Sequence, residues 1–130
     1  MDSIIRSAML DFYPSTEHLP GLDQTDLDGF LKRFKKEAPP LMWAGVVAGA
    51  LAYETSPILT IGKPARASKL SAEDRDRHAD LIGSTNIYHV RQLIFVLKMM
   101  AGMAWGQAPE VRRALGLEPY PEDPGTWRTQ

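Results

Sequence analysis

The sequence contains no cysteine among its 130 residues. Disulfide frameworks, thiolate nucleophiles and cysteine-ligated zinc sites are therefore excluded together. A cysteine-free chain fits a reducing compartment. The first ten residues show neither the apolar block of a secretory signal nor a twin-arginine pair. We expect a cytoplasmic protein, and co-export with a partner stays open as an alternative.

The chain also lacks an excess of charge of one sign. Fifteen Lys and Arg residues stand against sixteen Asp and Glu residues, which gives a net charge of -1. A balanced chain has no global field that attracts a nucleic-acid backbone. Lys63, Arg66 and Lys69 form a basic stretch, but the long helix predicted after it is apolar where a recognition helix carries polar side chains. We expect no nucleic-acid partner.

Long apolar runs are absent as well. The most hydrophobic stretch covers the thirteen residues 41–53, which carry no charge, and it ends at Glu54 and Pro57. A membrane-spanning helix needs about 20 apolar residues. We therefore predict a buried helix here and no membrane span.

Patterns that carry chemistry are missing too. The three histidines are His18, His78 and His89, and zinc needs more converging ligands than they supply. We interpret them as surface or capping residues. Glu54 is a lone carboxylate at a helix end, and carboxylates in that place are usually solvated or paired. No serine lies in a nucleophile-elbow pattern, and no glycines form a phosphate-binding loop. The sequence predicts no catalytic, cofactor-binding or metal-binding residue in this chain.

Helical periodicity is what the chain does contain, and no strand pairing is visible. We predict an all-α bundle of about five to six helices, with Ser3 and Ser71 as N-caps and a long loop over 56–69. Small residues at Gly45 and Gly49 leave room on the third helix for another helix to approach closely. The predicted helices cover about 3–12, 23 or 25 to 38, 40 or 41 to 53, 72–83, 85 or 86 to 106, and 109–115. Residues 1–117 are predicted to form the helical domain and residues 118–130, with three prolines, an extended tail.

Two of these helices, 41–53 and 86–106, are apolar nearly all round. A chain of this size has little else with which to cover them, so the excess predicts a protein partner. Aromatic residues on a proline-rich tail suit an anchor on a partner's surface. The residues predicted to face the partner are Trp43, Tyr53, Met99, Met103, Trp105, Tyr120, Trp127 and Arg128.

Two other interpretations stay open at this point. The chain could be a stand-alone helical module for an apolar small molecule, with Met99, Met100, Met103 and Trp105 lining the pocket, because methionine walls adapt to a ligand's shape. It could also be a homo-oligomer whose copies cover each other.

Four segments, taken in order, resemble a known family. They are the helix end Ala-Met-Leu-Asp-Phe-Tyr-Pro over 8–14, the helix start Lys-Leu-Ser-Ala-Glu-Asp-Arg over 69–75, the long helix over 88–98, and the closing helix with its glycine over 109–116. This order resembles the small helical region of GMC-type FAD-dependent alcohol dehydrogenases and oxidases, as in gluconate 2-dehydrogenase subunit 3-like proteins. Leu117 and the Ala-Trp-Gly sequence over 104–106 depart from that pattern.

The resemblance implies a non-catalytic accessory subunit. In that family the FAD fingerprint and the catalytic histidines belong to the large subunit. The resemblance therefore implies a large GMC flavoprotein as partner, with FAD in that partner and none in this chain.

Overall fold

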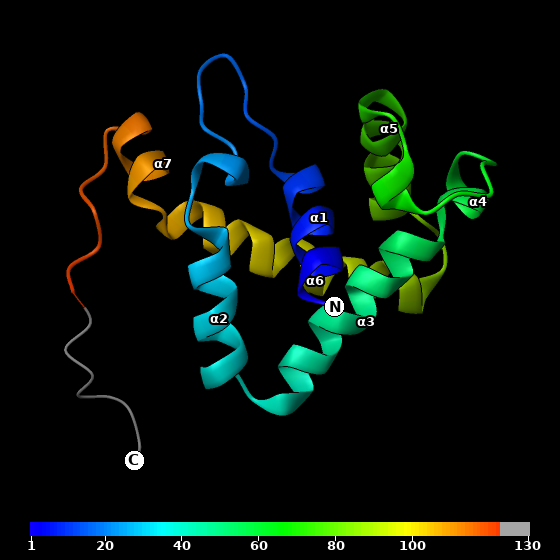
Figure 1. The fold of residues 1–130 in the computed structure, drawn as a ribbon, viewed down its shortest axis with the longest axis horizontal. Helices are drawn as coiled ribbons and strands as arrows, with labels where there is room; N and C mark the ends of the chain where they lie inside the picture. Colours follow the sequence, from blue (N-terminus) through cyan, green and yellow to red (C-terminus); the bar gives the residue numbers. More distant parts are fainter. Residues whose placement is uncertain (123–130) are drawn as a thin grey trace.

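The computed structural model describes residues 1–122, and within them it contains α-helices and short 3-10 helices but no strand. The all-α prediction is confirmed. The α-helices are α1 (Asp2–Phe12), α2 (Leu27–Glu37), α3 (Pro40–Thr55), α4 (Pro57–Thr60), α5 (Ala72–Gly83), α6 (Tyr88–Gln107) and α7 (Pro109–Ala114), and the 3-10 helices are η1 (Leu22–Gln24) and η2 (Ala67–Lys69) (Figure 1).

Several helix ends follow local sequence signals. The hydroxyl of Ser71 accepts a hydrogen bond from the backbone N–H of Asp74, so the predicted N-cap of α5 is confirmed. At the end of α7, the N–H groups of Gly116 and Leu117 donate to the carbonyls of Arg113 and Arg112, and Gly116 has a φ of 73°. This is a Schellman motif, which needs a residue that tolerates positive φ. Glycine supplies it.

Three predicted boundaries are corrected. Helix α1 begins at Asp2 with Met1 as its N-cap, so Ser3 lies inside the helix. Helix α2 begins at Leu27, because the side chain of Asp26 accepts from the N–H of Gly29 and residues 22–24 form a separate 3-10 turn. The connection over 56–69, predicted as a loop, contains α4 and η2.

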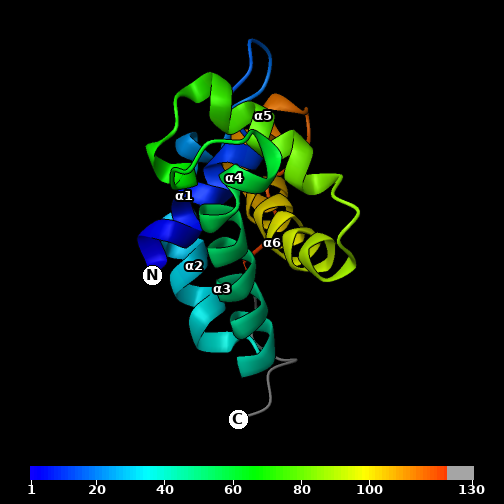
Figure 2. The same ribbon diagram turned by 90° about the vertical axis from the view of Figure 1, so that its right-hand side faces the viewer.

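Helix α6 forms the base of the fold. It has 20 residues, which corresponds to about 30 Å. It crosses behind α1, α2 and α3 (Figure 1), and α3 makes the most extensive contact with it. Seen from the side, α3 lies between α1 on one side and α6 on the other (Figure 2).

Glycine makes the α3–α6 contact possible. A Cβ placed on Gly49 would lie 2.6 Å from the carbonyl oxygen of Leu93, and one on Gly45 would lie 3.6 Å from Val96. The two helices therefore approach each other at Gly49 more closely than any larger residue allows. The predicted small face of α3 is confirmed, and its partner is α6.

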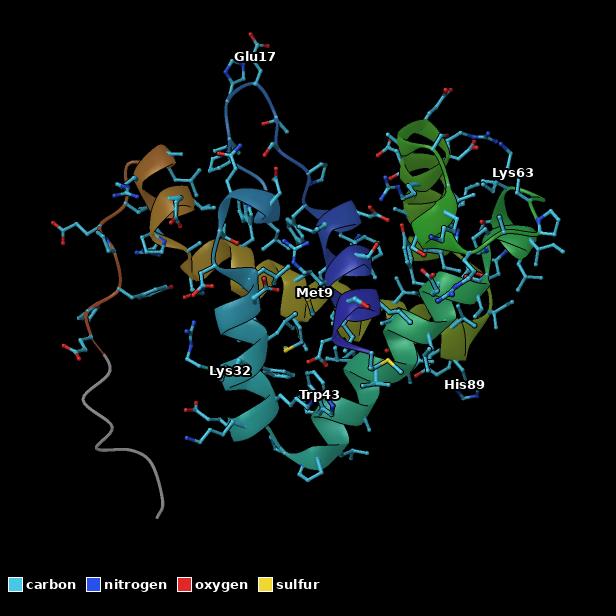
Figure 3. All side chains as sticks on the ribbon, viewed as in Figure 1. Met9, Glu17, Lys32, Trp43, Lys63 and His89 are labelled. Carbon is cyan, nitrogen blue, oxygen red and sulfur yellow. The ribbon has the colours of Figure 1, made fainter. Side chains whose placement is uncertain are left out.

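The core lies where α1, α3, α5 and α6 meet. Ile5, Met9, Val46, Tyr53 and Leu97 are each at most 1% exposed, and Met9 lies in the interior of the bundle (Figure 3). The outer face of α3 is not enclosed. Leu41 and Leu51 are 84% and 38% exposed, so the prediction of a buried helix holds for its inner face only. Among residues 1–122, no helix is long and apolar enough to cross a membrane.

Candidate functional site

An apolar stripe runs along the outside of α6. Tyr88, Phe95, Met99 and Met103 are separated by seven, four and four residues, which places them on one side of a helix. Their exposed fractions lie between 37% and 59%. We call these four residues the α6 face. An exposed apolar patch that extends along a whole helix is typical of a protein or ligand contact.

A groove lies on each side of this face. The α2–α6 groove has a volume of about 450 Å³, and its apolar wall consists of Phe30, Phe34, Met42, Met100 and Met103. The Phe95 groove has a volume of about 580 Å³ and is lined by Tyr13, Phe95 and Met99, with Arg91 and Lys98 among its polar residues. Both volumes fall within the ~300–1,000 Å³ typical of ligand pockets.

Three of the residues predicted to face a partner lie on the surface. Met99 and Met103 belong to the α6 face but to different grooves. Tyr120 is 63% exposed, and the guanidinium carbon of Arg112 lies 3.9 Å from its ring centroid. The Nε of Arg112 also donates to the carbonyl of Glu118. One arginine of α7 thus holds the start of the tail.

Two predicted residues are half-buried and already have contacts inside the domain. Trp43 packs against Phe34 at 6.1 Å between ring centroids, between α2 and α3. The indole N–H of Trp105 donates to the carbonyl of Pro20 at 2.8 Å, and the ring stacks on Tyr13 at 5.7 Å. Trp105 therefore fastens the loop before η1 to α6.

Tyr53 corrects the prediction. Its side chain is 1% exposed and belongs to the core, so it does not lie on any surface that a partner contacts. The burial of Tyr53 could not be predicted from its position at the end of an apolar helix, because the residues that cover it come from α1 and α5. Trp127 and Arg128 lie outside the described residues.

Met99, Met100, Met103 and Trp105, predicted together as the wall of one pocket, are separated by the structure. Met100 and Met103 line the α2–α6 groove, and Met99 lines the Phe95 groove. Trp105 packs on Tyr13 instead. Phe95 and Tyr88 were not predicted to lie on the surface. Their positions, four and eleven residues before Met99, nevertheless place all three on one side of α6.

A polar network fills the space between α1, α3 and α5. The hydroxyl of Tyr53 donates to Asp11 at 2.7 Å, and Arg75 lies 3.7 Å from the other oxygen of that carboxylate. Burial raises the pKa of Asp11 above its usual value, although the hydrogen bond from Tyr53 opposes the shift. Burial and the neighbouring Asp11 carboxylate together raise the pKa of Tyr53.

His78 belongs to the same network and is fully buried, so the prediction of a surface or capping residue is wrong. Its Nε2 lies 2.8 Å from the carbonyl oxygen of Tyr53, and its Nδ1 lies 2.6 Å from the hydroxyl of Thr60. A carbonyl only accepts, so Nε2 carries the proton and Nδ1 of the neutral ring accepts from Thr60. Burial lowers the pKa of His78 below its usual value, against the opposing effect of the Tyr53 carbonyl.

Glu54 is paired with groups of the same domain. Its carboxylate is 3% exposed and accepts from the Nε of Arg66 at 3.0 Å and from the backbone N–H and hydroxyl of Ser68. Lys63 forms an ion pair with Asp74 and lowers its pKa by hydrogen bonding. Two of the three cations of the 63–69 stretch therefore hold this connection against α3 and α5.

Most of these groups are hydrogen-bonded or ion-paired inside the domain, but the buried Nε of Arg75 has no hydrogen-bond partner among the described residues. Within residues 1–122, no group of three or more His, Asp or Glu side chains is placed to hold a metal ion. The α6 face with its two grooves is an exposed apolar surface of the described part of the chain. Comparison with known protein families, with curated proteins and with solved structures finds no match to this chain.

Proposed function

We propose that this chain is a non-catalytic small subunit that binds and stabilises a FAD-dependent GMC-type alcohol or sterol dehydrogenase. Hydride transfer from the alcohol to FAD takes place in the partner, and no residue of this chain is assigned to the flavin. The observation that carries the proposal is the exposed α6 face. The sequence resemblance supplies the identity of the partner.

The energetics support a protein contact at this face. Phe95 and Met103 are 59% and 56% exposed on the longest helix of the domain. Burial of apolar surface stabilises a contact by about 25 cal/mol per Å². Phe and Met are also enriched in the buried centre of protein interfaces. The positive charges of Arg91 and Lys98 beside Phe95 suit the polar rim of such an interface.

The tail adds a second contact in this proposal. Tyr120 and Trp127 supply apolar area on a proline-rich segment, which loses little conformational entropy when it docks. We expect residues 118–130 to lie along the large subunit. Removal of the residues after Gly116 is expected to weaken the complex by about tenfold or more, and each tenfold step is equivalent to ~1.4 kcal/mol.

The experiment first reads the adjoining reading frame for a large GMC flavoprotein. That flavoprotein is then co-expressed with this chain and the complex is affinity-purified through this chain. Flavin absorbance that elutes with the wild-type chain supports the proposal. Phe95→Glu is expected to reduce the co-eluting flavin at least tenfold. His89→Glu, an exposed position at the start of the same helix (Figure 3), serves as the matched control and keeps it.

The behaviour of the isolated chain gives the opposing outcome. A chain that is monodisperse, unfolds cooperatively as a monomer and brings no flavin with it contradicts the proposal. If the chain truncated after Gly116 fails to fold, the tail belongs to this domain's own core and the anchor on the partner is wrong.

A further inference from the structure

The α2–α6 groove combines an apolar wall with a basic border. Phe30 and Phe34 stack on each other at 6.0 Å between ring centroids, and Met42, Met100 and Met103 complete the wall. Met103 is 56% exposed, so its side chain is accessible from the groove mouth. Methionine is flexible and polarizable, and walls made of it adjust to an aliphatic chain.

The charged residues at the border of the groove lie on α2, the helix that also carries Phe30 and Phe34. Arg33 and Glu37 follow Phe30 and Phe34 by three residues and line the groove from the solvent side of α2. Lys36 lies three residues after Arg33, which places it on that same side. Lys32 points outward from α2 (Figure 3).

The charged residues that line the groove are one cation, Arg33, and one acid, Glu37, while the segment of α2 that carries them is positive. Residues 32–37 contain four cations and one acid, Glu37. Lys35 forms an ion pair with Asp2 and lies over the Trp43 ring. No ion pair between described residues involves Lys32, Arg33 or Lys36. A ligand with an apolar chain and an anionic head is complementary to this arrangement, since the guanidinium of Arg33 binds carboxylates well.

We propose that the α2–α6 groove binds a single-chain anionic amphiphile, such as a fatty acid, with the aliphatic chain against Phe34, Met42 and Met103 and the carboxylate at Arg33. This inference goes beyond the proposed function, although Met103 belongs both to the α6 face and to the α2–α6 groove. Phe95 does not line this groove, so Phe95→Glu tests the partner contact and Arg33→Gln tests the ligand site. A fatty acid in the groove covers apolar surface that the domain itself leaves exposed.

The first test uses the full chain and three probes with the same chain length: dodecanoate, dodecanol and dodecyltrimethylammonium. Isothermal titration calorimetry at concentrations below micelle formation measures the affinity of each. Dodecanoate is expected to bind with one molecule per chain. Dodecanol is expected to bind about fivefold more weakly, and the cationic probe more weakly still. Equal affinity for dodecanoate and dodecanol, or no binding of dodecanoate, overturns the proposal.

The methionines locate the bound probe. The chain has six, and their methyl groups are resolved by NMR after ¹³C labelling. The signals of Met42, Met100 and Met103 are expected to shift on addition of dodecanoate, whereas those of Met9 and Met99 stay in place. Shifts at Met99 without shifts at Met103 place the probe in the Phe95 groove and overturn the assignment.

Substitutions separate the contributions of the chain and the head group. Met103→Glu introduces a carboxylate into the groove and is expected to weaken dodecanoate binding at least tenfold. Met99→Glu, on the same helix but outside the groove, is the matched control and leaves it unchanged. Arg33→Gln is expected to weaken dodecanoate about fivefold and to leave dodecanol unaffected. Equal effects of Arg33→Gln on both probes exclude the proposed head-group contact.

One further variant tests whether residues of this chain, rather than a fatty acid, occupy the α2–α6 groove. If Trp127→Ala raises the affinity for dodecanoate more than tenfold, residues of this chain compete for the groove, and the proposal is overturned for the full chain. Unchanged affinity in Trp127→Ala supports the groove as a free ligand site.

Discussion

His78 is an imidazole enclosed between three elements. Thr60 of α4 and the carbonyl of Tyr53 in α3 hold its two nitrogens, and Asp11 of α1 and Glu54 of α3 are the charged groups that act on it. The two carboxylates favour the protonated ring, but loss of hydration opposes it more strongly. The native packing therefore favours the neutral form of His78.

This arrangement predicts a pH dependence of stability. Because the pKa of His78 is lowered from 6.5 in the folded state, the unfolded chain binds a proton more readily. Its contribution to stability is complete above about pH 6.5 and is lost as the pH falls from there through the folded pKa. We expect urea unfolding to give a lower free energy of unfolding at pH 5.0 than at pH 7.5.

Substitution isolates the source of the effect. His78→Gln removes the titrating ring and is expected to flatten this part of the pH profile, whatever its effect at pH 7.5. His89→Gln, a change at the periphery of the molecule (Figure 3), keeps the wild-type profile. A His78→Gln profile as steep as the wild type assigns the pH dependence to other groups.

At the scale of elements, α3 and α6 cross in close contact at Gly49. Gly49→Ala would place a methyl group 2.6 Å from the carbonyl oxygen of Leu93, which is backbone and has no rotamer to change. The helices must move apart, at a cost of ~1–3 kcal/mol. Gly106→Ala is the matched control, since nothing lies within 4 Å of its Cβ position.

Thermal and urea unfolding measure both variants. Gly106→Ala is expected to be neutral or to stabilise by up to ~1 kcal/mol, because alanine restricts the unfolded chain and favours helix. If Gly49→Ala is as stable as Gly106→Ala, the crossing tolerates a side chain and the close approach is not required.

The same elements show how far local sequence determines the fold. The small face of α3 was predictable because glycine at i and i+4 in an apolar helix has few other uses, yet the identity of the facing helix depends on the whole chain. Helix α4 was not predictable. It has four residues, too few to be stable alone, and the hydrogen bond between Thr60 and His78 that fixes it joins residues 18 positions apart.

At the scale of the molecule, the apolar excess of the sequence indicated uncovered surface but not its location. Tyr53 and Phe95 are both aromatic residues on apolar helices, and one is 1% exposed and the other 59%. The difference arises from α1 and α5, which pack over Tyr53 and leave the outer side of α6 open. Such long-range packing is why the predicted site included buried Tyr53 and omitted Phe95.

The exposed α6 face predicts that the isolated chain self-associates. Without a partner, Phe95 and Met103 are covered only if two copies bury them against each other, and this gains about 25 cal/mol per Å² of apolar area. Sedimentation velocity over a range of concentrations is expected to show a rising sedimentation coefficient for the wild type. Phe95→Glu is expected to weaken self-association at least tenfold, because it removes the apolar ring and the carboxylate that replaces it must lose its hydration to enter the contact.

Leu59→Glu is the matched control for this prediction. Leu59 is 73% exposed, more than Phe95, but it lies on α4 rather than on α6. If exposure alone caused self-association, Leu59→Glu would suppress it at least as well as Phe95→Glu. We expect Leu59→Glu to sediment like the wild type, because one apolar side chain on a four-residue helix offers less area than a stripe along 20 residues. If Leu59→Glu suppresses self-association and Phe95→Glu has no effect, the two copies associate through the α3–α4 side of the molecule and not through the α6 face.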